Sequence, residues 1–203
     1  MFNVLAIIAA YLIGSLSFAV IVSKYYGMDD PRTYGSGNPG ATNVLRSGKK
    51  KAAVLTLLGD AVKGLVAVIL ARCLQGALNL SDATIALVAI AALVGHMWPI
   101  FFNFKGGKGV ATALGVLLAL SPATALLCTL IWLVMAFGFK VSSLAALVAT
   151  VCAPIFAFFM MPHASWAWAT VFIAALVLYR HKSNIQNLIQ GKESKIGDKA
   201  GKS

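Results

Sequence analysis

Residues 110–139 read VATALGVLLALSPATALLCTLIWLVMAFGF and contain no charged side chain. This run is longer than the roughly 20 apolar residues that one helix needs to cross a bilayer. Because proline fits the first turn of a helix better than its middle, Ser121 and Pro122 predict a turn inside the run. We expect a short helix over 110–120 and a second over 122–139, with one kinked helix as the alternative.

The apolar character of this run extends through most of the chain. Of the 203 residues, 60% are hydrophobic and 11% are charged, whereas about 25% are charged in an ordinary soluble domain. Five further apolar runs have roughly the length of a membrane span: 2–22, 52–74, 83–102, 141–161 and 164–179. The sequence therefore predicts an all-α integral membrane protein with seven transmembrane helices, or six if 110–139 is one helix.

The basic residues divide unevenly between the two ends of these helices. The chain has 17 Lys and Arg against six Asp and Glu, and a seven-helix arrangement places 15 of the 17 on one side. Because cytoplasmic loops are enriched in Lys and Arg, we expect the N-terminus outside and the C-terminus in the cytoplasm. Six helices would put the basic tail outside. Few aromatic residues are interleaved with the basic runs, which argues against a nucleic-acid partner.

The first polar cluster on the basic side is GSGNPGATNVLR, residues 35–46. Its glycines permit close backbone approach, and Arg46 offers a guanidinium fork that suits phosphate oxygens. Four further side chains could donate to an anion held in such a loop: Ser36, Asn38, Thr42 and Asn43. The alternative is a glycine-rich turn with surface arginines.

A second cluster, GHMWPIFFNFKGGKGVAT, covers residues 95–112. Its second half holds Lys105, Gly106, Gly107, Lys108 and Gly109, directly before an expected helix start. Backbone N–H groups and the positive end of a helix favour phosphate at such a place. The pattern is not a Walker A loop, because glycine rather than Ser or Thr follows Lys108. The alternative is a flexible basic loop that contacts lipid headgroups.

A third cluster, YRHKSNIQNLIQGKESKIG, covers residues 179–197. If the helix continues past Tyr179, His181 and Asn184 stand three residues apart on one face and can reach the same ligand. Ser142 and Ser143 open the helix expected over 141–161, where serine is a good N-cap and could also donate to an anion. No loop gathers His, Cys and carboxylates, so we predict no metal site.

Two charged residues, Asp60 and Lys63, interrupt the apolar run 52–74. Unpaired charge is costly inside a membrane, so we expect the two to pair or to face a polar interior. His96, at the start of the second cluster, could be either a ligand or a residue that packs between helices.

The three clusters, in this order, resemble the three cytoplasmic motifs of the bacterial acyl-phosphate-dependent glycerol-3-phosphate acyltransferases, the PlsY family. Gly14-Ser15 and Ser142-Ser143-Leu144 extend the resemblance over essentially the whole chain. It implies one membrane-embedded acyltransferase domain over 1–203, with a polar tail over about 192–203 that we expect to fray. It also implies seven helices in the bacterial inner membrane and an active site that faces the cytoplasm.

The reaction implied by the resemblance moves a fatty acyl group from acyl phosphate to the 1-hydroxyl of sn-glycerol 3-phosphate. The products are lysophosphatidate and phosphate, this is the first step of bacterial phospholipid synthesis, and no cofactor takes part. We expect Arg46, Lys105 and the loop 106–109 to hold glycerol 3-phosphate. Ser36, Thr42, Asn43 and Ser143, with Ser142 beside them, would hold acyl phosphate.

Four residues are the candidates for catalysis: His181, Asn184, Ser36 and Asn38. His181 is the candidate general base, because a neutral imidazole is available near pH 7, and Asn184 would orient the hydroxyl. In the alternative mechanism a substrate phosphate takes the proton, since carboxylates are scarce in these loops.

A small membrane transporter of anionic metabolites is the alternative function. Basic loops and intramembrane charges would suit it, but no inverted repeat is visible. A phosphatidyl transferase would normally use a metal-binding array of aspartates, and the chain has six acids in all. Membrane lipids are expected neighbours, and contact with the enzyme that makes acyl phosphate stays open.

Overall fold

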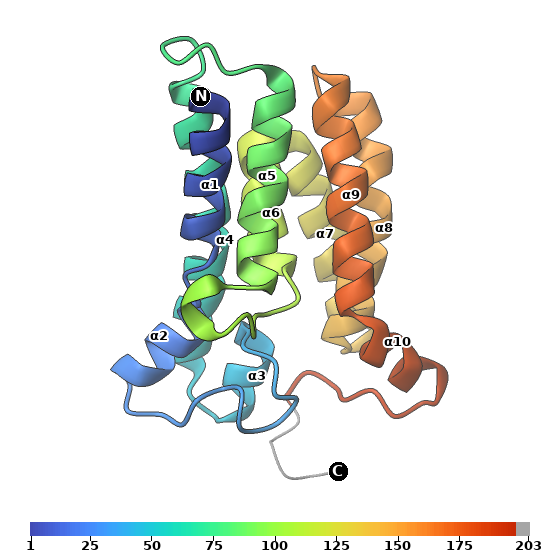
Figure 1. The fold of residues 1–203 in the computed structure, drawn as a ribbon. Helices are drawn as coiled ribbons and strands as arrows, with labels where there is room; N and C mark the ends of the chain where they lie inside the picture. The colour runs from blue at the N-terminus through green and yellow to red at the C-terminus, as the bar shows by residue number, and fades with distance from the viewer. Residues whose placement is uncertain (198–203) are drawn as a thin grey trace.

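Ten α-helices and one short 3₁₀-helix follow one another through residues 1–197, the part of the chain that the computed structural model describes (Figure 1). Their bounds are α1 Phe2–Gly14, α2 Phe18–Tyr25, α3 Ala41–Arg46, α4 Lys50–Cys73, α5 Asp82–Met97, η1 Ile100–Phe102, α6 Val110–Leu120, α7 Pro122–Phe139, α8 Ser142–Met160, α9 Ala164–Arg180 and α10 Lys182–Ile189. The predicted all-α architecture is confirmed.

Five helical segments are long and apolar enough to cross a membrane: Phe2–Tyr25, Lys50–Cys73, Asp82–Phe102, Pro122–Phe139 and Ser142–Met160. Two shorter apolar helices, Val110–Leu120 and Ala164–Arg180, complete the set of seven predicted segments.

The run 110–139 forms two helices, as its proline predicts. Ser121 caps the N-terminus of α7 by accepting a hydrogen bond from the N–H of Thr124 at 3.3 Å, and Pro122 is the first helical residue. Proline suits that position because the first N–H of a helix has no partner within the helix.

Two other predicted helices are interrupted. The segment 2–22 breaks between α1 and α2, where the Ser15 hydroxyl donates to the carbonyl of Tyr11 at 2.8 Å and the Lys63 ammonium to that of Leu16 at 2.6 Å. These two donors satisfy carbonyls near the break, so it costs little even among apolar helices. Within the segment 83–102 the α-helix ends at Met97, because Pro99 lacks the N–H that would continue the helix.

Glycines bring two pairs of helices into close contact. A methyl group at Gly14 of α1 would lie 2.1 Å from the carbonyl oxygen of Ala92 in α5, and one at Gly95 of α5 would lie 2.2 Å from that of Tyr11. Gly64 of α4 and Gly115 of α6 approach the opposite helix in the same way. Small residues permit such packing between membrane helices, where apolar burial supplies little driving force.

The polar segments gather at one end of this bundle. In Figure 1 α2, α3 and α10 lie from left to right along the lower end, and the N-terminus and the loop between α4 and α5 lie at the upper end. Within the bundle, the predicted pairing of Asp60 and Lys63 is confirmed: their charged groups are 2.8 Å apart, and each residue is 3% exposed.

Candidate active site

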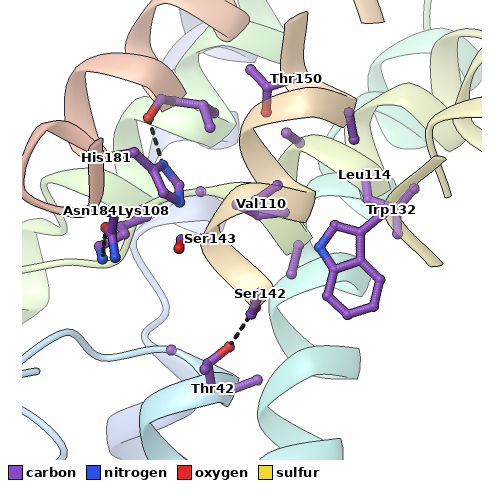
Figure 2. A pocket seen from close by; sticks show the side chains of 18 of the residues that line it. Thr42, Lys108, Val110, Leu114, Trp132, Ser142, Ser143, Thr150, His181 and Asn184 are labelled. Atoms are coloured by element: carbon purple, nitrogen blue, oxygen red, sulfur yellow. Dashed lines mark hydrogen bonds between the residues drawn. The ribbon is translucent and has the colours of Figure 1, made fainter. Parts of the chain in front are cut away.

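A cavity of about 410 Å³, the larger cavity, opens where the polar ends of α6, α8 and α9 meet α3. Figure 2 shows side chains from the predicted clusters around it, among them Thr42, Lys108, Ser143 and His181. Eleven of the fourteen predicted site residues line it: Ser36, Asn38, Thr42, Asn43, Arg46, Lys108, Gly109, Ser142, Ser143, His181 and Asn184. Three clusters far apart in the sequence therefore meet at one place.

Beyond this mouth the larger cavity continues as a mostly apolar arm between α6, α7, α8 and α9, and Leu57, Asp60 and His96 line a further part of its wall. On α8 the lining residues recur at helical spacing, through Ala146, Ala149 and Ala153. Trp132 of α7 and Leu117 of α6 face the same space. At a rise of 1.5 Å per residue, the ten steps from Ser143 to Ala153 give the arm a length of about 15 Å. Such a slot suits an extended hydrocarbon chain whose polar end stays at the mouth.

A second cavity of about 280 Å³, the smaller cavity, adjoins the first and has polar walls. Its lining residues are Ser36, Gly37, Asn38, Gly106, Lys108, Tyr179, Arg180, Lys182 and Ser183. Ser36, Asn38 and Lys108 line both cavities, so they stand at the junction of the two. The three cations of the smaller cavity suit a small anion.

Two predicted residues lie outside both cavities. Lys105 is exposed, and its side chain lines neither space. Gly107 is buried behind the lining, and Gly106 lines only the smaller cavity. The glycine loop, residues 106–109, thus presents Lys108 rather than Lys105 to the cavities.

Asn43 supports the first loop instead of offering its amide to a ligand. It is 2% exposed, and its NH₂ group donates to the carbonyls of Pro31 at 2.7 Å and Tyr34 at 3.1 Å. Its Oδ1 accepts from the N–H of Ser36 at 3.0 Å. The predicted donation from Asn43 to a substrate is therefore wrong in this structure, because both of its amide hydrogens are taken. Gly35, at φ 58°, is needed here, since a methyl group would lie 2.2 Å from Asn43 Oδ1.

Lys108 belongs to a polar network that crosses the mouth of the larger cavity. Its ammonium donates to Asn184 Oδ1, and Asn184 Nδ2 donates to Glu193 Oε1 at 2.6 Å. Ser143 Oγ donates to the same carboxylate oxygen at 2.7 Å. Burial lowers the pKa of Lys108, an effect partly opposed by the carboxylate of Glu193. The network fixes the Lys108 ammonium between the two cavities.

His181 ends α9 with its ring turned into the larger cavity (Figure 2). It is 3% exposed, and its Nδ1 lies 2.8 Å from the carbonyl oxygen of Val177. A carbonyl can only accept, so Nδ1 carries the hydrogen and Nε2 of the neutral ring is free to take a proton. Burial lowers the pKa of His181, which keeps this neutral form populated at pH 7.

The segment 192–197, here the tail segment, lies across the same mouth. Arg46 donates to Ser194 Oγ, and the N–H of Ile196 donates to the carbonyl of Lys140 at 2.7 Å. The expectation that the tail frays is therefore wrong for 192–197, and residues 198–203 lie outside the described part. Ser142 is likewise not the cap of α8: Val141 holds that position, and Ser142 Oγ lies 3.3 Å from Thr42 Oγ1.

Sequence reasoning assigned no role to two residues of this site, Glu193 and Arg180. Glu193 is one of six acids in the chain, so an isolated carboxylate among basic residues was the available signal. Arg180 looked like one more cytoplasmic cation, and only the fold reveals that its guanidinium reaches the glycine loop. Among residues 1–197 no three His, Cys, Asp or Glu side chains lie close enough to hold a metal ion.

Comparisons with known proteins agree over nearly the whole chain. A family model described as glycerol-3-phosphate acyltransferase matches residues 4–191. A glycerol-3-phosphate acyltransferase of Neisseria meningitidis serogroup C / serotype 2a is 81% identical over 98% of this chain and 100% of that relative. The enzyme of the same description from Chromobacterium violaceum is 60% identical over 95% of this chain and 94% of that relative.

Two solved structures share the fold. Both are crystal structures of PlsY, described as an integral membrane glycerol 3-phosphate acyltransferase. The glycerol 3-phosphate form superposes with a TM-score of 0.89 at 39% identity, over 97% of this chain and 96% of that one. The lysophosphatidic acid form gives 0.88 at 38% identity, over 98% and 97%.

Proposed function

Since this chain belongs to the glycerol-3-phosphate acyltransferase family, and so is an integral membrane enzyme that makes lysophosphatidate, we propose that its acyl donor is an acyl phosphate. The observation that carries the proposal is the pair of adjoining cavities. One has an apolar arm with a polar mouth, the other has polar walls, and Lys108 lines both.

In this proposal the acyl chain occupies the apolar arm and its phosphate lies at the mouth, beside Arg46, Thr42, Ser142 and Ser143. Glycerol 3-phosphate occupies the smaller cavity against the glycine loop. Arg46 is thereby moved from glycerol 3-phosphate to acyl phosphate, because it lines only the larger cavity. Lys105 receives no substrate contact.

The chemical step depends mainly on how the two substrates are placed and on how their negative charges are screened. The 1-hydroxyl oxygen of glycerol 3-phosphate attacks the acyl carbon, the bond from that carbon to the phosphate oxygen breaks, and inorganic phosphate leaves as an anion. The hydroxyl proton passes to Nε2 of His181 and later to solvent. Lys108 screens the repulsion between the two phosphates. In a closed site this screening favours the reaction, as does the placement of the two substrates.

The donor is tested with purified protein in detergent. Palmitoyl phosphate should yield lysophosphatidate and free phosphate in equal amounts, and only when glycerol 3-phosphate is present. Palmitoyl-CoA should yield no lysophosphatidate. Product from the thioester but not from the acyl phosphate, in folded protein, would overturn the proposed donor.

We also propose seven membrane crossings with the site on the cytoplasmic side of the inner membrane. Support comes from the basic residues, 15 of 17 of which fall on the side of the polar clusters. In a variant without native cysteines, a cysteine at Gln75 should react with an impermeant maleimide from outside, and one at Lys49 should not. The reverse labelling pattern would invert the proposed orientation.

Gly107→Ala should raise the KM for glycerol 3-phosphate by about 10- to 100-fold while leaving the KM for acyl phosphate nearly unchanged. The added methyl group would lie 2.3 Å from His96 Nε2 and 3.0 Å from the carbonyl oxygen of Pro39, so the loop and the residues that hold it must shift apart. Steady-state kinetics in both substrates checks this. Gly138→Ala is the matched control, because nothing lies within 4 Å of a methyl group there. An unchanged KM in Gly107→Ala would contradict the placement of glycerol 3-phosphate.

A further inference from the structure

Arg180 donates two hydrogen bonds to the protein backbone, although it lines a cavity suited to an anion. Its Nη2 donates to the carbonyl of Gly106 at 2.7 Å, and its Nε donates to the carbonyl of Gly107 at 3.2 Å. The guanidinium also lies 5.6 Å from the centre of the Trp98 ring. This is the fork geometry in which arginine holds two acceptors at once and in which lysine cannot replace it.

His96 holds the same loop from the other side. Its carbonyl accepts the N–H of Gly107 at 3.2 Å, and its ring Nε2 faces Gly107 so closely that no methyl group fits between them. A buried ion pair lies beside this ring: Nδ1 of His96 is 3.5 Å from Asp60 Oδ1, and the Asp60 carboxylate pairs with Lys63 at 2.8 Å. His96 is 7% exposed and Asp60 3%, and both border the larger cavity.

The two supports decide which way the loop peptides face. A trans peptide is planar, with its C=O and the following N–H on opposite edges. Since the carbonyl of Gly107 turns to Arg180, the N–H of Lys108 points away from Arg180. The orientation of this N–H, in the loop proposed to hold glycerol 3-phosphate, is therefore set by the two supports.

We propose that Arg180 and His96 are positioning residues that clamp the glycine loop from opposite sides and thereby set the affinity for glycerol 3-phosphate. The inference rests on the proposed binding of that substrate at the loop. Arg180 acts through the backbone carbonyls of Gly106 and Gly107, not as a free cation. His96 acts through Gly107, with the Asp60–Lys63 pair buried beside its ring.

The test is Arg180→Lys, which keeps the charge but loses the fork. KM for glycerol 3-phosphate should rise about tenfold, the effect of one lost charge-assisted hydrogen bond, while KM for palmitoyl phosphate stays within about twofold. An unchanged KM for glycerol 3-phosphate overturns the proposal, because a lysine would serve equally well as a phosphate ligand. A parallel loss for both substrates also overturns it, because that outcome indicates general damage.

A double-mutant cycle separates the clamp from direct contact with substrate. In Gly107→Ala the loop has already moved, so adding Arg180→Lys should raise KM by less than about twofold further. If the two substitutions raise KM by factors that multiply in the double variant, Arg180 acts independently of the loop. That result would reject the proposal. If Gly107→Ala itself leaves the KM for glycerol 3-phosphate unchanged, the proposed placement of that substrate is wrong. Failure of the placement can thus be told apart from failure of the clamp.

His96→Gln provides the second, independent variant. It should show the same selective rise in KM for glycerol 3-phosphate, and this rise should not add to that of Gly107→Ala. A normal KM would exclude His96 from the clamp. Arg72→Lys is the matched control. Arg72 also donates to a backbone carbonyl, that of Ala119, and its guanidinium lies 5.1 Å from the Trp166 ring at the opposite end of the bundle. Arg72→Lys should leave both KM values unchanged. A selective rise in KM for glycerol 3-phosphate in Arg72→Lys would mean that the result for Arg180→Lys does not depend on the glycine loop.

Discussion

His181→Gln should lower kcat by about 10²- to 10⁴-fold, the usual contribution of a positioned general base. The Nδ1–H of His181 is committed to the carbonyl of Val177, so Nε2 is the atom that can accept the hydroxyl proton in the cavity. Glutamine is polar and of similar size but cannot take a proton near neutral pH. Single-turnover rates at saturating concentrations of both substrates measure the loss.

The alternative in which a substrate phosphate takes the proton makes the opposite prediction. There, His181→Gln would keep most of its turnover, with normal binding and folding. His163→Gln is the matched control: His163 lies before α9 at the far end of the helix, with its ring 3.1 Å from Asp82. It should keep wild-type turnover.

The pH profile gives a second measurement of the same role. Burial lowers the pKa of His181 from its ordinary value of 6.5, and a base must be unprotonated to act. The acid limb of the activity profile should therefore have its midpoint below pH 6.5. The acid limb should vanish in His181→Gln. A decline centred above pH 6.5 would contradict a buried imidazole as the base.

Lys108→Met should reduce kcat/KM by about 10²- to 10³-fold, comparable to the loss of one preorganised electrostatic group. Methionine keeps most of the length of the side chain but removes the charge that lies between the two cavities. Because both substrates are phosphates, the loss should appear in kcat as well as in both KM values. Steady-state kinetics at constant ionic strength gives the three parameters.

Lys105→Met is the matched control for Lys108→Met. Both lysines flank the same two glycines, yet Lys105 lies outside both cavities. We expect an effect of less than about threefold for Lys105→Met, as for a surface substitution. A loss as large as that of Lys108→Met would restore the substrate contact that the sequence predicts for Lys105.

The local features of this fold could be predicted because they depend on residues near one another in the sequence. Pro122 and the lengths of the apolar runs are sufficient to divide 110–139 and to place α4, α7 and α8 within a few residues. The break after α1 could not be predicted, because it depends on Lys63 of α4 reaching the carbonyl of Leu16. That contact joins residues on different helices and leaves no periodic pattern.

The candidate site divides in the same way. Residue type and clustering were sufficient to select eleven lining residues, but not to say what each side chain touches. Asn43 and Arg180 have the chemistry of phosphate ligands, yet both bind backbone carbonyls. Glu193 joins the site because the tail segment folds back to Ser143. Such pairings depend on the three-dimensional path of the chain.

The shortness of α6 decides where the two substrates meet. Its eleven residues span about 16 Å, roughly half of the 30 Å hydrocarbon thickness of a bilayer. One end adjoins the start of α7 at Ser121, so in the proposed topology the glycine loop at the other end lies below the cytoplasmic membrane surface. Irregular backbone is tolerated at that depth where it lines a polar cavity. In the proposed arrangement the water-soluble substrate therefore reaches the acyl chain below the membrane surface, and that chain stays within the bilayer.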